Sequence, residues 1–173
     1  MGRAAPSLER QLDTFTTGEV GVLVRPSEDQ TPGQAKAELE RALQTMDRAR
    51  FRIDVESDET GHTWLVIRDR DLVQLSAATQ AAGETLVSAG LADRVMAAVY
   101  AFQWRDAALD RDRRVYWIYQ PRLRGYTPFV PDGEPADRQR DHTLEVRMEA
   151  AIRRDLPTYR QVTEWYPIWG MPV

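Results

Sequence analysis

Apolar and polar residues alternate along several short segments, which is the pattern of β-strands that bury one face. Residues 50–56 alternate strictly, and residues 63–68 (TWLVIR) follow after a short turn, so this pair predicts a β-hairpin. Further strands are predicted at 19–25, 94–104, 114–120 and 126–130. The last of these is predicted to be an edge strand because it contains Pro128, which lacks the backbone N–H that a central strand needs.

Three longer segments carry apolar residues at helical spacing and predict helices at 34–48, 72–89 and 136–155. Asp71 is a suitable N-cap for the second helix, and Gly90 suits the position after its end. The polar stretch 1–17 is predicted to be frayed, with a short helix at 7–15, and residues 105–112 and 132–138 are predicted loops.

The order of these elements predicts an α+β fold. Hairpins outnumber crossovers, so we expect a mainly antiparallel sheet of about five or six strands with about three helices packed on one face. The chain of 173 residues has the length of a single domain, 1–173, in which 158–173 would be a docked aromatic tail. The element order loosely resembles the YbjN and type III secretion chaperone folds, a likeness that carries no argument about function.

Composition narrows the class of protein. Apolar residues make up 42% of the chain, enough for a core, and cysteine is absent, which excludes disulfides and thiol chemistry. No secretory signal and no run of about 20 apolar residues is visible, so we expect a cytoplasmic protein without a transmembrane segment. The net charge of −4 argues against a general nucleic-acid binder.

No pattern of catalytic or metal-binding residues stands out. Gly-rich phosphate loops and a nucleophile elbow are missing, and the two histidines, His62 and His142, lie far apart in the sequence. The carboxylates cluster beside arginines at 68–71, 110–113 and 137–141, which is typical of solvated ion pairs. We therefore predict no catalytic residue, cofactor or metal site. A small hydrolase or nucleotide-handling enzyme built on these Arg and Asp groups remains the alternative.

The segment near the C-terminus is unusually aromatic. Trp165, Tyr166, Pro167 and Trp169 lie within five residues and are the candidate tail anchor or partner-binding residues. Two interpretations stay open: the rings fold back onto the domain, or they form a strip that binds another molecule. A peripheral membrane-binding role is a further alternative because Trp and Tyr favour membrane interfaces.

Several segments are similar in order and sequence to the PspAB family, the PspA-associated proteins of phage-shock loci. The similar segments span roughly residues 19–172 and include 63–69 (TWLVIRD), 85–90 (TLVSAG), 115–119 (VYWIY), 125–131 (GYTPFVP), 144–147 (LEVR), 155–157 (DLP) and 165–172 (WYPIWGMP). Leu91 and Ala92 stand where that family tends to have Phe-Gly, so the chain resembles a divergent member.

The resemblance implies a bacterial accessory role beside PspA, a coiled-coil protein that protects stressed membranes. It implies a protein partner, in particular a PspA-type coiled-coil protein, and membrane association only through that partner. The resemblance supplies no catalytic residue and no cofactor. It therefore predicts a non-enzymatic adaptor or regulator of an envelope-stress response and leaves homo-oligomer formation open.

Overall fold

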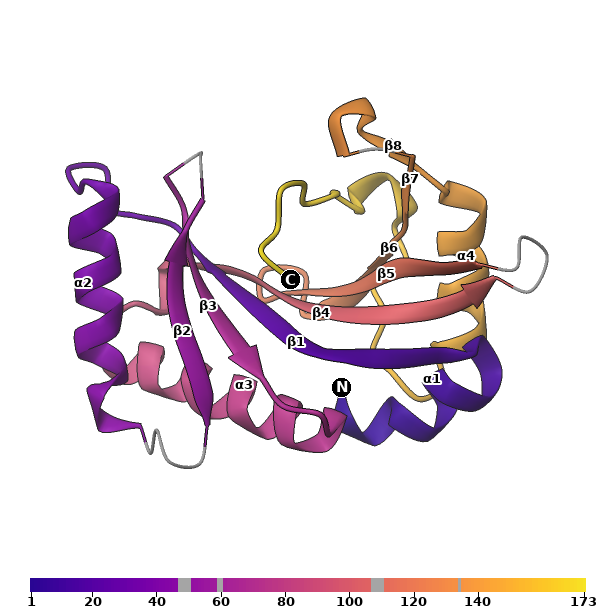
Figure 1. Cartoon of the computed structure of the whole chain (residues 1–173), viewed down its shortest axis with the longest axis horizontal. Helices are drawn as coiled ribbons and strands as arrows, with labels where there is room; N and C mark the ends of the chain where they lie inside the picture. The colour runs from indigo at the N-terminus through magenta and orange to yellow at the C-terminus, as the bar shows by residue number, and fades with distance from the viewer. Residues whose placement is uncertain (47–50, 59–60, 107–110, 134) are drawn as a thin grey trace.

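Six strands form one curled sheet in which every neighbouring pair is antiparallel (Figure 1). The computed structural model describes residues 1–46, 51–58, 61–106, 111–133 and 135–173. The strands lie in the order β2-β3-β1-β4-β5-β6. Their bounds are β1 Thr14–Val24, β2 Arg52–Ser57, β3 Thr63–Arg68, β4 Val95–Asp106, β5 Arg111–Gln120 and β6 Gly125–Phe129.

Helices border this sheet, and three of them begin at a side-chain cap. The α-helices are α1 Ala5–Leu12, α2 Pro32–Ala42, α3 Leu72–Ser88 and α4 His142–Ile152, and the 3-10 turns are η1 Gly2–Ala4, η2 Leu43–Thr45, η3 Ala92–Arg94, η4 Pro135–Asp137 and η5 Val162–Glu164. The side chains of Thr31, Asp71 and Asp141 accept backbone N–H groups at the starts of α2, α3 and α4. Each cap satisfies a donor that has no partner inside its helix.

Much of the predicted architecture is confirmed. The α+β class and the antiparallel sheet are present, and β2 and β3 form the predicted hairpin. Asp71 caps α3, and Gly90, with a positive φ of 75°, follows its end. The strand that contains Pro128 is β6, which lies at the edge of the sheet.

The start of the chain differs from the prediction. The first strand begins at Thr14 rather than residue 19, because its first residues pair with the end of β4 and are separated from the rest by a bulge between Thr16 and Val20. Gly18 lies in this bulge with φ 84°, a conformation that glycine adopts without strain. Residues 2–12, placed in a frayed stretch from the sequence, are helical, and Leu8 is fully buried.

The last helix also differs, since the prediction that it begins at residue 136 is wrong. β7 Pro131–Asp132 and β8 Gln139–Arg140 instead pair as a small two-stranded ribbon, and η4 follows β7 in the chain. Arg113 on β5 donates to Asp132 and Asp141 and so ties this ribbon to the sheet. The helix starts only after Asp141, its cap. Of the predicted loop 105–112, residues 105–106 belong to β4 and 111–112 to β5, and 107–110 lie outside the described residues.

One face of the sheet packs against the helices. The main core cluster joins strand residues such as Val22, Tyr100 and Trp117 to helix residues such as Leu75 and Met148. Alternate residues of the same strands point to the opposite face, where Trp64, Val66, Val99, Ile118 and Phe129 form a second apolar cluster. Both faces are therefore apolar, and each needs a cover.

The C-terminal segment covers the second face. Val173 is buried in the second cluster, and Ile168, Trp169 and Met171 pack against it, so the yellow end of the chain in Figure 1 lies across the sheet opposite α3. Gly21 on β1 makes room for this layer: a Cβ atom there would lie 2.9 Å from the ring of Trp64 and 3.4 Å from Val173.

Candidate functional site

The aromatic tail begins by extending the edge of the sheet. Tyr126 on β6 donates its N–H to the carbonyl of Pro157 and accepts from the N–H of Tyr159, both at 2.9 Å. These bonds give Tyr126 and Thr158 a parallel bridge. The backbone groups of the edge strand are thereby satisfied at this point, which lowers the tendency of an open edge to pair with another chain.

Trp165 is the most deeply buried of the four tail residues singled out from the sequence, with 4% of its surface exposed. Its indole N–H donates to the carbonyl of Tyr159 at 2.7 Å, and its own carbonyl accepts from Arg140 at 2.7 Å. The ring also lies edge-on to His142, 6.1 Å between centroids. Trp165 is therefore held by both its side chain and its backbone.

The other three residues are more exposed. Pro167 and Trp169 are half-buried, and the ring of Trp169 meets Phe129 edge-on at 4.9 Å. Tyr166 is 56% exposed, although both its neighbours in the chain are at least partly covered. The tail thus holds two tryptophans against the domain and presents one tyrosine to solvent between them.

A buried ion pair lies beneath the tail. Glu145 in the first turn of α4 is fully buried, and its carboxylate accepts from Arg140 through Nε and Nη2 at 2.6 to 3.0 Å and from the N–H of Val130 at 2.9 Å. The Nδ1 atom of His142 lies 3.1 Å from the same carboxylate. Because Arg140 also donates to Trp165, this cluster connects β8, α4, the tail and Val130 between β6 and β7.

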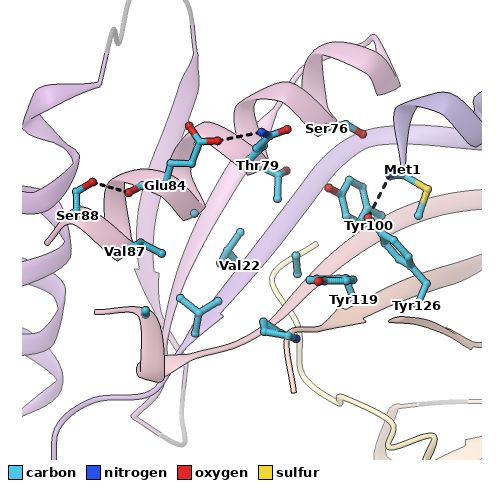
Figure 2. Close-up of a pocket in the computed structure, with 16 residues that line it drawn as sticks. Met1, Val22, Ser76, Thr79, Glu84, Val87, Ser88, Tyr100, Tyr119 and Tyr126 are labelled. Atoms are coloured by element: carbon cyan, nitrogen blue, oxygen red, sulfur yellow. Dashed lines mark hydrogen bonds between the residues drawn. The ribbon is translucent and has the colours of Figure 1, made fainter. Parts of the chain in front are cut away.

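A cavity of about 720 Å³ lies on the face of the sheet that packs against the helices, between α3 and strands β1, β4 and β5 (Figure 2). Its size falls within the range of small-molecule sites. Val22, Val95 and Ala98 contribute apolar surface, and Tyr100, Tyr119 and Tyr126 bring hydroxyl groups to one end. Glu84 is the one carboxylate among the described residues that line it.

The tyrosines at this end of the cavity are packed together. Tyr126 lies 5.0 Å from Tyr119 and 6.1 Å from Tyr100 between ring centroids, and its hydroxyl accepts from the Met1 amine at 3.3 Å. Burial raises the pKa of Tyr126 well above its ordinary value, and the neighbouring Tyr100 raises it further. Burial also raises the pKa of Tyr100, although the hydroxyls of Thr79, Ser76 and Tyr126 oppose the shift. Both groups therefore stay protonated at neutral pH.

We expect the free energy of unfolding to fall as the pH rises above about 10, the pKa of a tyrosine in an unfolded chain. Above that pH the unfolded chain releases tyrosine protons that folded Tyr100 and Tyr126 retain, so the unfolded state binds fewer protons and is favoured. Urea unfolding midpoints across an alkaline pH series measure this loss. Tyr126→Phe should make the decline shallower, and an equally steep decline in that variant would contradict the assignment.

The alternative hypothesis of a small enzyme relies on Arg and Asp side chains. Several of these side chains instead form ion pairs and helix caps. Arg68 on β3 donates to Glu19, Asp54 and Glu56, and Asp71 caps α3. His62 and His142 lie beside different carboxylates, Asp58 and Glu145. Within the described ranges, no group of three or more His, Asp or Glu side chains is arranged to hold a metal ion.

No helix in the described part of the chain is long and apolar enough to cross a membrane. The cavity, the Arg140–Glu145 cluster and the covered strand edge were not predicted from the sequence. Their residues come from several elements, and only the folded topology brings them together.

Comparison with known proteins gives one result. The family model described as PspAB, PspA associated protein B, matches residues 1–173. No curated protein and no solved structure is significantly similar to the chain, so the loose likeness to YbjN and to secretion chaperones stays a prediction. The match confirms the resemblance seen in the sequence motifs, extends it to the N-terminal segment, and implies by the family's description an association with PspA. Since the match covers the whole chain, the protein belongs to the PspA associated protein B family.

Proposed function

We propose that the protein is a non-enzymatic adaptor or regulator of a PspA-type membrane-stress response and that it acts by binding a protein partner. The observation that carries this proposal is the match of the whole chain to a family described as PspA-associated. The partner is a PspA-type coiled-coil protein. The adaptor is cytoplasmic and reaches the membrane through this partner.

We place the partner contact on the exposed part of the tail. Tyr166 projects into solvent, and Pro167, Ile168 and Trp169 beside it are half-buried, so the strip offers an aromatic ring next to partly covered apolar surface. Tyrosine is among the residues that contribute most to protein interfaces. A coiled coil presents ridges of side chains along its length, and an aromatic ring can pack between them.

The geometry of the tail supports this placement. Arg140 donates a hydrogen bond to the carbonyl of Trp165, the backbone group directly before Tyr166. The indole N–H of Trp165 donates in turn to the carbonyl of Tyr159. A residue that is already ordered loses less conformational entropy when it binds, so a preorganised tyrosine binds more tightly than a mobile one.

We expect Tyr166→Ala to weaken binding to the PspA-type protein about tenfold or more without changing the melting temperature, because hot-spot aromatic residues contribute roughly 2 kcal/mol or more. Isothermal titration calorimetry with the purified partner measures the first effect, and a thermal melt measures the second. The matched control is Phe15→Ala on β1, which removes an aromatic ring of similar exposure, 52%, outside the tail.

Two outcomes would contradict the proposal in different ways. If co-purification from native cells never recovers a PspA-type protein, the adaptor role fails. If the partner binds but Tyr166→Ala and Phe15→Ala have equal effects, the adaptor role stands and the tail is the wrong surface.

A further inference from the structure

The cavity beneath α3 is open to solvent at one side and closed by tyrosines at the other (Figure 2). Val87 and Glu84 on the C-terminal half of α3 line it and are exposed, Val87 to 61%, so the mouth lies along this part of the helix. Farther in, Val22 and Ala98 are buried and give the cavity an apolar wall.

One hydroxyl group at the inner end is directed into the cavity. Ser76 Oγ nearby is shut off from solvent, so a ligand in the cavity does not reach it. Figure 2 shows the Tyr119 hydroxyl on the side of Val22, directed away from Tyr126 and into the cavity.

The charge of the lining restricts the ligand. The described lining residues include Glu84 at the mouth and no Arg or Lys side chain. The Met1 amine at the inner end already donates to the Tyr126 hydroxyl, and burial lowers its pKa, which favours its uncharged form. A phosphate or sulfate would bring negative charge into a largely apolar space without a matching side-chain cation, which is unfavourable. An uncharged hydroxyl, carbonyl or ester oxygen can instead pair with the Tyr119 hydroxyl.

From this complementarity we propose that the cavity binds a neutral single-chain amphiphile, with its hydrocarbon chain against Val22 and Ala98 and its oxygen end at the Tyr119 hydroxyl. The chain enters between Val87 on α3 and Val95 at the start of β4, and the oxygen end goes in first. This site lies on the opposite side of the sheet from the tail and does not depend on the partner contact proposed above.

The test uses three probes of equal chain length: 1-decanol, decane and decyl phosphate. Titration into the isotopically labelled protein, followed by NMR, should show saturable binding of 1-decanol with shifts at α3, β4 and β5. Decane should bind more weakly because it cannot pair with Tyr119, and decyl phosphate more weakly because of its charge. Tyr119→Phe should weaken decanol binding roughly three- to tenfold, the effect of one neutral hydrogen bond.

Gly83 allows the cavity to be filled without disturbing the helix. It lines the cavity, and a Cβ atom at this position would meet no atom within 4 Å. Leucine is a better helix former than glycine, so Gly83→Leu should preserve α3 and lower decanol binding at least tenfold. The matched control is Ala77→Leu, an exposed position on the same helix outside the lining, which should bind as the unmodified protein does.

Vesicles of phosphatidylcholine with and without monooleoylglycerol distinguish the source of the ligand. Transfer of monooleoylglycerol to the protein after the vesicles are removed supports a bilayer source, and capture of decanol alone supports a soluble one. The proposal is overturned if none of the neutral probes binds, if decyl phosphate binds best, or if Gly83→Leu binds decanol as well as Ala77→Leu does.

Discussion

Replacing Glu145 by alanine should lower the free energy of unfolding by about 3–5 kcal/mol, the cost of breaking a buried ion pair by removing one partner. The substitution leaves the N–H of Val130 without its acceptor and Arg140 without the carboxylate that it contacts through two nitrogens. Denaturant unfolding followed by tryptophan fluorescence measures the change. We expect a large shift of the midpoint for this single substitution.

Two variants serve as controls for Glu145→Ala. Glu145→Gln keeps an acceptor for Val130 but loses the charge, so it should be less destabilising than the alanine variant. Asp54→Ala breaks a more exposed ion pair with Arg68 and should cost no more than about 1 kcal/mol. If Glu145→Ala and Asp54→Ala cost the same, the buried cluster does not stabilise the fold in the way inferred.

The second large effect is expected for Trp165→Ala. Because Trp165 is 4% exposed and its indole N–H donates to the carbonyl of Tyr159, loss of its side chain should cost about 3–5 kcal/mol. Trp169→Ala should cost less, about 1–3 kcal/mol, because that ring is only half-buried against Phe129. Thermal melts of the two variants compare them directly.

The same variants separate the two interpretations of the tail. If Trp165→Ala melts as the unmodified protein does but no longer binds its partner, Trp165 acts in binding and its structural role is refuted. If its melting temperature falls and binding is also lost, unfolding alone could explain the lost binding. The Tyr166→Ala variant, which should remain folded, then shows whether the tail contacts the partner.

The elements predicted best from the sequence are those whose signals lie within a few neighbouring residues. The hairpin of β2 and β3 follows from the alternation of apolar and polar residues. Helix α3 follows from apolar residues at helical spacing, with Asp71 at its start and Gly90 after its end. The start of α4 could not be predicted in this way. Residues 136–140 have a composition compatible with a helix, but β7–β8 pairing and the bonds of Arg113 to Asp132 and Asp141 hold them in another conformation.

The candidate sites were less accessible to sequence reasoning. The tail was visible because its aromatic residues are adjacent in the chain. Glu145 was not, because a glutamate in the first turn of a helix is ordinarily solvated, and its partner Arg140 lies outside that helix. The cavity was hidden for a similar reason: Tyr100, Tyr119 and Tyr126 belong to three strands, and each alone has the alternation of ordinary core packing.

The tail that covers the second apolar face also imposes an order of events during synthesis. All six strands of the sheet have been made by the time Phe129 is added, but the segment that shields Trp64, Val99 and Ile118 belongs to the 44 residues that follow. At about 5–20 residues per second, a ribosome needs roughly 2–9 s to add them. During that interval the nascent sheet presents an uncovered apolar surface to neighbouring chains, and a chaperone that binds such surfaces would find it there.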